Sequence, residues 1–414
     1  MAGNVELLAP AGDFECLEYA LRYGADAVYL GAKAFGMRSS SANFSQQELA
    51  AAVALAHGQG KKVYLTLNTL PTNAEMDQMP GAVQSAACAG VDALIVADLG
   101  VLEVAKRCAP GLDVHISTQA GIVNWAAATA AHSLGARRVV LARELTLEDI
   151  ATIRAKTPAA LELEVFVHGA MCMSVSGRCL LSNYLNGRDA NRGQCSQPCR
   201  WKYSLLEEKR PGQQFEISED DYGSYIMSAD DLCAAPFLDQ VVQAGAASLK
   251  IEGRAKSFYY VASVTAAYRA ALDAVRAAGP GGYRLPEFTA AELEKTSHRP
   301  YSAGFFFGRQ GATQSPTVGG YLRRWQPVAV VEKQAQDGVY CSQRGKFSLG
   351  ERLEALVPPG RVVAFTPGAI WNADGEAITA TPHTKMRFSV PAPAGEMFPP
   401  GTILRKPLDT TGAG

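Results

Sequence analysis

The chain has 414 residues, of which 48% are hydrophobic and 19% charged, and its formal net charge at pH 7 is −1. One hydrophobic core rarely serves so long a chain, so we expect two domains. The near-neutral charge excludes a protein that coats nucleic acid through a general basic field, although it allows a local basic patch. The amino terminus has no basic region followed by a long apolar run, and no later stretch reads as a membrane span, so we expect a cytoplasmic protein.

One unit recurs through the first 251 residues: an alanine-rich amphipathic helix, a glycine that can end it, and a short apolar run. The glycine and its following run occupy residues 24–30, 90–96, 135–141 and 245–251. Further apolar runs at 7–9, 62–67, 114–117 and 163–167 complete eight candidate strands. This alternation predicts an α/β fold, a (β/α)8 TIM-like barrel, with a doubly wound open sheet as the alternative.

Polar residues follow the predicted strands, where the active face of such a barrel lies. They are Asn68, Asp98, Gln119, Arg143, Glu144, His168, Glu252 and Arg254. Each could instead serve as a helix cap or a loop hydrogen-bonding group. Glu164, within the seventh strand, is expected to point into the barrel as a structural acid.

The composition changes after about Leu272, where Pro280-Gly281-Gly282 interrupts the helical pattern. Alternating apolar runs at 328–333, 339–342, 362–365 and 386–390 then predict a small all-β barrel domain. We therefore divide the chain into a barrel at 1–275, a connecting segment at 276–320, the β domain at 321–408 and a disordered tail at 409–414. The β domain could hold a macromolecule or act as a stabilising appendage.

Four cysteines, Cys172, Cys179, Cys195 and Cys199, fall within an insertion at 169–244, after the seventh predicted strand. Such a concentration of thiolates predicts a soft-metal site above the barrel mouth. Structural zinc sites usually use cysteine pairs with two to four intervening residues, and here only Cys195 and Cys199 are so spaced. The spacing therefore favours an iron–sulfur cluster over zinc, with a redox-sensing thiol pair third.

The other five cysteines are expected to be buried. Cys233 is a fifth possible ligand, but its apolar neighbour and a predicted helix start favour a buried thiol. Cys16, Cys88, Cys108 and Cys341 stand singly in apolar or strand-like contexts.

The motifs around these cysteines resemble those of the collagenase-like peptidase family U32. The resemblance is carried by residues 164–172 (EVFVHGAMC) and 176–182 (SGRCLLS), by 6–13, 24–29 and 199–201, and by 248–254 (SLKIEGR). It spans residue 1 to about residue 321, and the β-rich remainder resembles the family's carboxy-terminal domain. No Gly-x-Ser-x-Gly or His-Glu-x-x-His motif accompanies it, so the sequence does not support the peptidase label.

Within the family, the chain length, the single cysteine block and the segment 186–189 (NGRD) resemble bacterial proteins that convert the wobble uridine of tRNA to 5-hydroxyuridine. That resemblance implies a four-iron four-sulfur cluster and dependence on prephenate. Alternatives are a hydroxylase of another RNA or of a small aromatic, and a cluster-bearing scaffold that serves a separate catalyst.

The resemblance implies that Cys172, Cys179, Cys195 and Cys199 ligate the cluster. Prephenate carries two carboxylates, which suits Arg143, Lys250 and Arg254, although these cations could instead pair with Glu144 and Glu252. His168 could move a proton or only hydrogen-bond a cluster sulfur, and with Arg143 and Glu252 it completes the candidate catalytic set. The tRNA anticodon loop is expected to approach across Arg188, Arg192, Arg200 and the β domain, and an electron donor is a further possible partner.

Overall fold

The structure is a computed structural model. It describes residues 5–33, 43–172, 174–175, 178–201, 219–220, 223–224, 229–279, 281–308 and 321–408. The motif residues Ser176 and Gly177 and the tail at 409–414 therefore lie outside the described residues.

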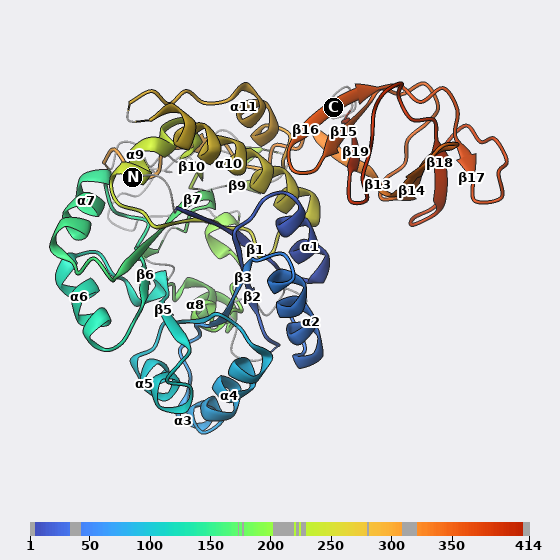
Figure 1. Cartoon of the computed structure of the whole chain (residues 1–414). Coiled ribbons are helices and arrows are strands. Elements are labelled where there is room, and N and C mark those ends of the chain that lie inside the picture. Colours follow the sequence, from blue (N-terminus) through green and yellow to red (C-terminus); the bar gives the residue numbers. More distant parts are fainter. Residues whose placement is uncertain are drawn as a thin grey trace, which may run out of the picture.

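The amino-terminal two thirds of the chain form a closed parallel barrel (Figure 1). Its strands are β1 (Glu6–Pro10), β2 (Ala27–Gly31), β3 (Lys62–Leu67), β4 (Ala93–Val96), β5 (Asp113–Ile116), β6 (Arg138–Val140), β7 (Glu162–Ala170) and β11 (Ser248–Ile251). Consecutive strands pair in parallel, and β11 closes the ring by pairing with both β1 and β7. The predicted (β/α)8 barrel is confirmed, and the open sheet is excluded.

Helices surround the strands as the repeated unit predicts. They are α1 (Phe14–Arg22), α2 (Gln46–His57), α3 (Asn73–Met76), α4 (Met79–Ala89), α5 (Leu99–Cys108), α6 (Trp125–Ser133), α7 (Leu147–Lys156), α9 (Leu238–Gln243) and α10 (Phe258–Ala278). Side chains such as Asp13 and Ser45 cap their amino ends by accepting backbone N–H bonds. Gly90 and Gly245 follow α4 and α9 with φ of 80° and 105°, a left-handed backbone that side-chain-bearing residues rarely adopt.

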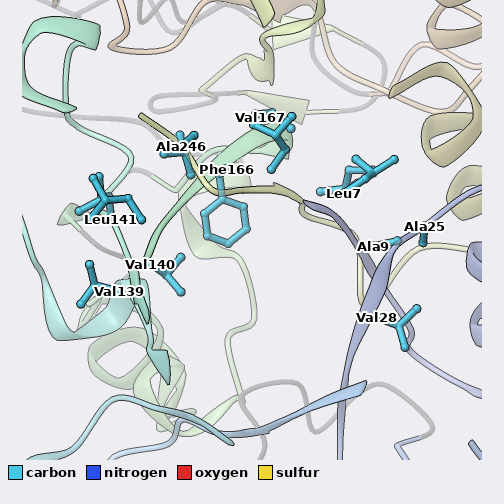
Figure 2. Close-up of a cluster of buried hydrophobic side chains, with 14 of the residues drawn as sticks. Leu7, Ala9, Ala25, Val28, Val139, Val140, Leu141, Phe166, Val167 and Ala246 are labelled. Atoms are coloured by element: carbon cyan, nitrogen blue, oxygen red, sulfur yellow. The ribbon is translucent and has the colours of Figure 1, made fainter. Parts of the chain in front are cut away.

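The parity of each strand decides which side chains face the helices and which face the barrel axis. Leu7 and Ala9 of β1 and Val28 of β2 belong to the large core beneath the helices, and Figure 2 shows them with other members from β6 and β7. Leu8 and Tyr29, on the opposite parity, join a smaller apolar cluster within the barrel.

A layer of buried charges lies within the barrel. Arg138 contacts the carboxylates of Glu6, Glu162 and Glu164 at 2.6, 2.7 and 3.0 Å, and Lys250 contacts Glu164 at 2.7 Å. Burial alone would raise the pKa of Glu164, but Lys250 and Arg138 outweigh it and hold that pKa at about 2. Glu164 is thus the ionised inward-pointing acid that the sequence predicts.

The segment between β7 and α9 departs from the repeated unit. It contains α8 (Leu181–Asn186), the turns Ala190–Arg192 and Pro198–Arg200, the hairpin β8 (Glu219–Asp220) and β9 (Gly223–Ser224), and β10 (Asp231–Cys233). In Figure 1, α8 is seen within the outline of the strand ring. β10 extends β7 by antiparallel pairing, so Cys233 lies in a strand and the predicted helix start there is wrong.

The β domain is a seven-stranded antiparallel sheet with its own core. Its strands are β13 (Trp325–Ala335), β14 (Gly338–Gln343), β15 (Leu353–Val357), β16 (Arg361–Phe365), β17 (Trp371–Asn372), β18 (Arg387–Val390) and β19 (Ile403–Pro407). The alternating apolar runs predict β13, β14, β16 and β18, whereas no such run predicts β15, β17 and β19. Among the described residues, no helix is long and apolar enough to cross a membrane.

A buried ion-pair network joins the β domain to the barrel through α11 (Glu287–Leu293). Arg405 of β19, which is fully buried, forms a two-pronged ion pair with Glu292 of α11 and contacts Glu354 at 3.0 Å. Tyr23, which directly follows α1, donates a hydrogen bond to the carbonyl of Leu356 at 2.8 Å. These contacts fix the β domain beside the barrel.

Candidate functional site

A cavity of about 1030 Å³ opens at the carboxyl ends of the barrel strands. Its floor is formed by barrel residues such as Tyr29, Ile95 and Phe166. It continues past the cysteine segment to Tyr321 and Trp325 at the start of the β domain. The cavity therefore occupies the face where barrel enzymes place their active sites.

Cationic groups line the lower part of this cavity. The ammonium of Lys250 lies 4.3 Å from the centroid of the Tyr29 ring, above its ion pair with Glu164. Arg254 is 4% exposed and donates hydrogen bonds to Thr66 at 3.0 Å and Asn43 at 2.6 Å. Both side chains are held in place by these partners while they line the cavity.

Arg143 lies on the wall beside Glu252. Its guanidinium is 3.5 Å from the Glu252 carboxylate and stacks 3.8 Å from the centroid of the Phe166 ring. Each of the two charged side chains is 15% exposed. The expected alternative role of Arg143, pairing with Glu252, is thus present in the structure, and both groups still reach the cavity.

Amide and hydroxyl groups form a further part of the cavity wall. Asn68 donates to the side chain of Gln119 at 2.8 Å, and Ser117 donates to the same oxygen at 3.2 Å. Six of the eight predicted strand-end residues line the cavity: Asn68, Gln119, Arg143, Glu144, Glu252 and Arg254. Asp98 does not, because its carboxylate caps α5 by accepting bonds from Gly100 and Val101.

All four predicted ligand cysteines line this same cavity. The Leu181 N–H points at the sulfur of Cys179 at 3.4 Å, and the Gln197 N–H points at that of Cys195 at 3.3 Å. Backbone donors of this kind stabilise thiolates and tune iron–sulfur centres. The donor set is soft, lines one cavity and carries backbone hydrogen bonds at two of its sulfurs, which is chemistry that an iron–sulfur cluster accepts.

Within the described ranges, no three His, Cys, Asp or Glu side chains gather closely enough to hold a single metal ion. A mononuclear zinc site needs four ligands at about 2.0–2.3 Å from one centre. A cluster spreads its ligands over several iron atoms, so its cysteines stand farther apart.

His168 lies outside the cavity lining. It is 1% exposed, stands 3.3 Å from the Tyr268 hydroxyl through Nδ1, and is surrounded by the rings of Tyr260, Tyr268 and Tyr301. Burial lowers the pKa of His168 to about 3, so the imidazole is neutral at physiological pH. Its placement favours a structural role over the predicted proton transfer.

The remaining cysteines divide between buried and exposed positions. Cys233 is 8% exposed beside His168, and burial raises its pKa to about 11, as suits a buried thiol. Cys16 and Cys341 are also buried, whereas Cys108 is half-buried. Cys88 is exposed on α4, so its expected burial is wrong.

Arg188 and Arg192, two of the arginines predicted to receive RNA, lie outside the cavity lining. Arg192 makes a two-pronged ion pair with Glu75 of α3, in which the Arg192 Nη1 lies 2.9 Å from the Glu75 Oε2. This pair attaches the cysteine segment to the barrel. Arg188 is exposed. The structure describes the backbone of Arg200 but not its side chain.

Sequence reasoning missed two groups of cavity residues. Tyr29 and Phe166 lie on the inward parity of β2 and β7, which only the strand register reveals. Tyr321, Arg323 and Trp325 reach the cavity from the start of the β domain, a contact that no local pattern encodes.

Fold and site together define a TIM-like barrel whose mouth is covered by a cysteine-bearing segment and flanked by a β domain. Residues 12–316 match the model for Peptidase family U32, and residues 323–405 match that for the Peptidase family U32 C-terminal domain. The chain belongs to this family.

Three relatives illustrate what the chain is similar to. The tRNA hydroxylation protein P of Escherichia coli is 35% identical over 94% of both chains. The tRNA hydroxylation protein P1 of Bacillus subtilis is 37% identical over 91% of this chain and 89% of its own. A 23S rRNA 5-hydroxycytidine synthase of E. coli is 36% identical over 89% of this chain but only 54% of its own.

Proposed function

We propose that this protein is an RNA-hydroxylating enzyme that converts the wobble uridine of tRNA to 5-hydroxyuridine, with prephenate as a co-substrate. The observation that carries the proposal is the single cavity lined both by four cysteines and by the cationic side chains of the barrel. The relatives named for tRNA hydroxylation match this chain over nearly their full length, which favours tRNA over rRNA.

Cys172, Cys179, Cys195 and Cys199 would hold a four-iron four-sulfur cluster. Such a group supplies one-electron redox chemistry when bound. Four thiolates leave no iron free for substrate, so these cysteines either support electron transfer alone or include one that is displaced. The backbone N–H groups of Leu181 and Gln197 would stabilise the ligating sulfurs of Cys179 and Cys195.

Arg254, Arg143 and Lys250 would bind the two carboxylates of prephenate. Arg254 offers a rigid fork that is already held by Thr66 and Asn43, so little side-chain entropy is lost on binding. Glu252 keeps Arg143 oriented until an anion competes for it. Phe166, beneath Arg143, gives the lower cavity an apolar surface for a ring.

The target uridine would enter the same cavity from a single-stranded loop. Bases in the anticodon loop can be turned out of the stack at low cost, which permits chemistry on the base edge. The Asn68 and Gln119 amides are placed to read the polar edge of a pyrimidine.

Nucleoside mass spectrometry of tRNA from a deletion strain tests the proposal. We expect 5-hydroxyuridine and its derivatives to fall and to return on complementation with the wild-type chain. An unchanged tRNA profile in a strain without a second pathway would refute it, and a defect confined to rRNA would favour the rRNA alternative. Full restoration of tRNA modification by a Cys172→Ser, Cys179→Ser chain would contradict the need for a cluster, whereas purified protein that leaves tRNA unmodified in the presence of prephenate would favour the scaffold alternative.

A further inference from the structure

We infer that the junction between the barrel and the β domain is a subsite for a nucleotide that flanks the target base in single-stranded RNA. The subsite consists of Tyr321, Arg323 and Trp325 from the start of the β domain and Lys256 from the barrel. It rests on the proposed function and deepens it by assigning the second domain a part in substrate binding.

The size and shape of the cavity carry the first step. At about 1030 Å³, it reaches the upper end of the range for small-molecule pockets, roughly 300–1,000 Å³. The lining includes the cysteines and Lys250 on the barrel side, and Tyr321, Trp325 and Pro327 from the start of the β domain. The cluster, a small dicarboxylate and one base would occupy the part lined by the barrel and the cysteines, so the part lined by the β domain remains for the adjoining strand.

The chemistry of the junction carries the second step. The Lys256 ammonium lies 4.1 Å from the centroid of the Tyr321 ring and 5.0 Å from that of Tyr260. Tyr321 and Trp325 are half-buried and line the cavity. Aromatic faces beside cations are the usual means by which proteins bind single-stranded nucleic acid, because bases stack and phosphates attract the cations.

Arg323 supplies a cation for a phosphate. It is exposed and lines the cavity, and among the described residues no carboxylate pairs with it. The next residue, Arg324, differs because it pairs with Glu294 at 3.3 Å and lies outside the cavity lining. In a chain of net charge −1, RNA attraction must come from such individually placed cations.

The junction is also rigid. The Trp325 ring packs against two cations whose ion pairs join the β domain to the barrel. The Lys295 ammonium lies 4.8 Å and the Arg405 guanidinium 5.5 Å from the centroid of this ring. Lys295 in turn contacts Glu354 at 2.6 Å, and Arg405 is buried against Glu292. A stacking surface that is fixed before binding loses little entropy when RNA docks.

The test uses anaerobically purified full-length protein and a labelled anticodon stem-loop RNA, with fluorescence anisotropy at several salt concentrations. We expect Tyr321→Ala to weaken binding by roughly 5- to 150-fold, the range for loss of one stacked base, and Tyr321→Phe to bind like wild type. Arg323→Ala should lower the salt dependence by about one released ion, whereas its neighbour variant Arg324→Ala should not. In turnover assays, Tyr321→Ala and Arg323→Ala should each raise KM for tRNA and leave kcat unchanged.

Wild-type affinity and wild-type KM in both Tyr321→Ala and Arg323→Ala would overturn the inference. A rise in KM for prephenate with unchanged RNA affinity would also overturn it, because the junction would then serve the small molecule. If the wild-type protein leaves tRNA unmodified, the proposed function fails; RNA binding that still depends on Tyr321 and Arg323 would support the subsite independently.

Discussion

The ammonium of Lys250 lies 2.7 Å from the carboxylate of Glu164, and the same ammonium forms part of the cavity floor. Glu164 is fully buried and also contacts Arg138, which reaches Glu6 on β1. The charges that fix Lys250 therefore extend through the barrel interior. Stability of the barrel and orientation of the cavity floor depend on the same side chains.

Glu164→Gln should lower the free energy of unfolding by about 3 kcal/mol, because it leaves Lys250 and Arg138 buried with one partner fewer. Chemical denaturation at neutral pH measures this change. The control is Glu103→Gln, which removes an exposed i,i+4 pair with Arg107 and should cost less than about 0.5 kcal/mol. Equal effects of the two substitutions would show that the buried layer is not stabilising.

Stability should fall as the pH drops below about 6.5, because burial depresses the pKa of His168 to about 3 and lowers that of His115 as well. Above their unfolded pKa values both histidines are neutral in either state. Below pH 6.5 the unfolded chain binds protons that the folded chain excludes, so protonation favours unfolding. Denaturation midpoints at pH 7 and pH 5 should therefore differ less in His168→Gln than in wild type.

The control for that titration is His383→Gln, at an exposed histidine, which should keep the full pH dependence of the wild-type chain. A His168→Gln protein with the same difference between pH 7 and pH 5 as wild type would contradict the assignment of the proton to this buried ring.

Arg254→Lys should raise KM for prephenate by roughly 10-fold or more, since a charged hydrogen bond contributes about 1.5–3 kcal/mol and lysine lacks the fork. KM for tRNA should change much less. Steady-state kinetics with each substrate varied in turn separate the two effects. Parallel increases in both KM values would indicate general disruption of the cavity instead of lost carboxylate binding.

Arg405→Ala should destabilise the whole protein by about 3–5 kcal/mol, because it leaves Glu292 buried without its ion-pair partner. The matched control is Arg387→Ala, whose pair with Glu332 is largely exposed and should contribute little. Thermal unfolding followed by circular dichroism measures both. If Arg405→Ala unfolds in two transitions, with the β domain separating from a barrel that is still folded, the loss of stability lies at the junction between the two domains.

The barrel strands were predictable because each one is a short apolar run, and four of them (β2, β4, β6 and β11) follow a glycine that ends a helix, a pattern local to the sequence. The strand-end rule likewise located Arg143, Glu252 and Arg254 at the cavity. The rule was wrong for Asp98, whose side chain caps a helix instead. It was also wrong for His168, which is surrounded by tyrosine rings and lies outside the cavity lining.

Long-range contacts were not predictable from the same patterns. The pairing of Arg192 with Glu75 joins residues more than a hundred positions apart, so a basic residue near the cysteines proved to be a structural anchor. β19 was missed because its Arg405 and Lys406 read as surface charge, although Arg405 is fully buried by partners on other elements. The cavity wall formed by Tyr321 and Trp325 depends on how the two domains meet.

The most direct test of the account is reconstitution of the reaction with anaerobically purified protein, unmodified tRNA and prephenate, followed by nucleoside mass spectrometry. We expect wild type and Cys88→Ser, which alters an exposed cysteine outside the cavity, to contain about four irons per chain and to form 5-hydroxyuridine. Cys172→Ser should lose both the visible absorbance of the cluster and the product. A colourless wild-type protein that forms the product, or a Cys172→Ser protein that is as active as wild type, would contradict the account.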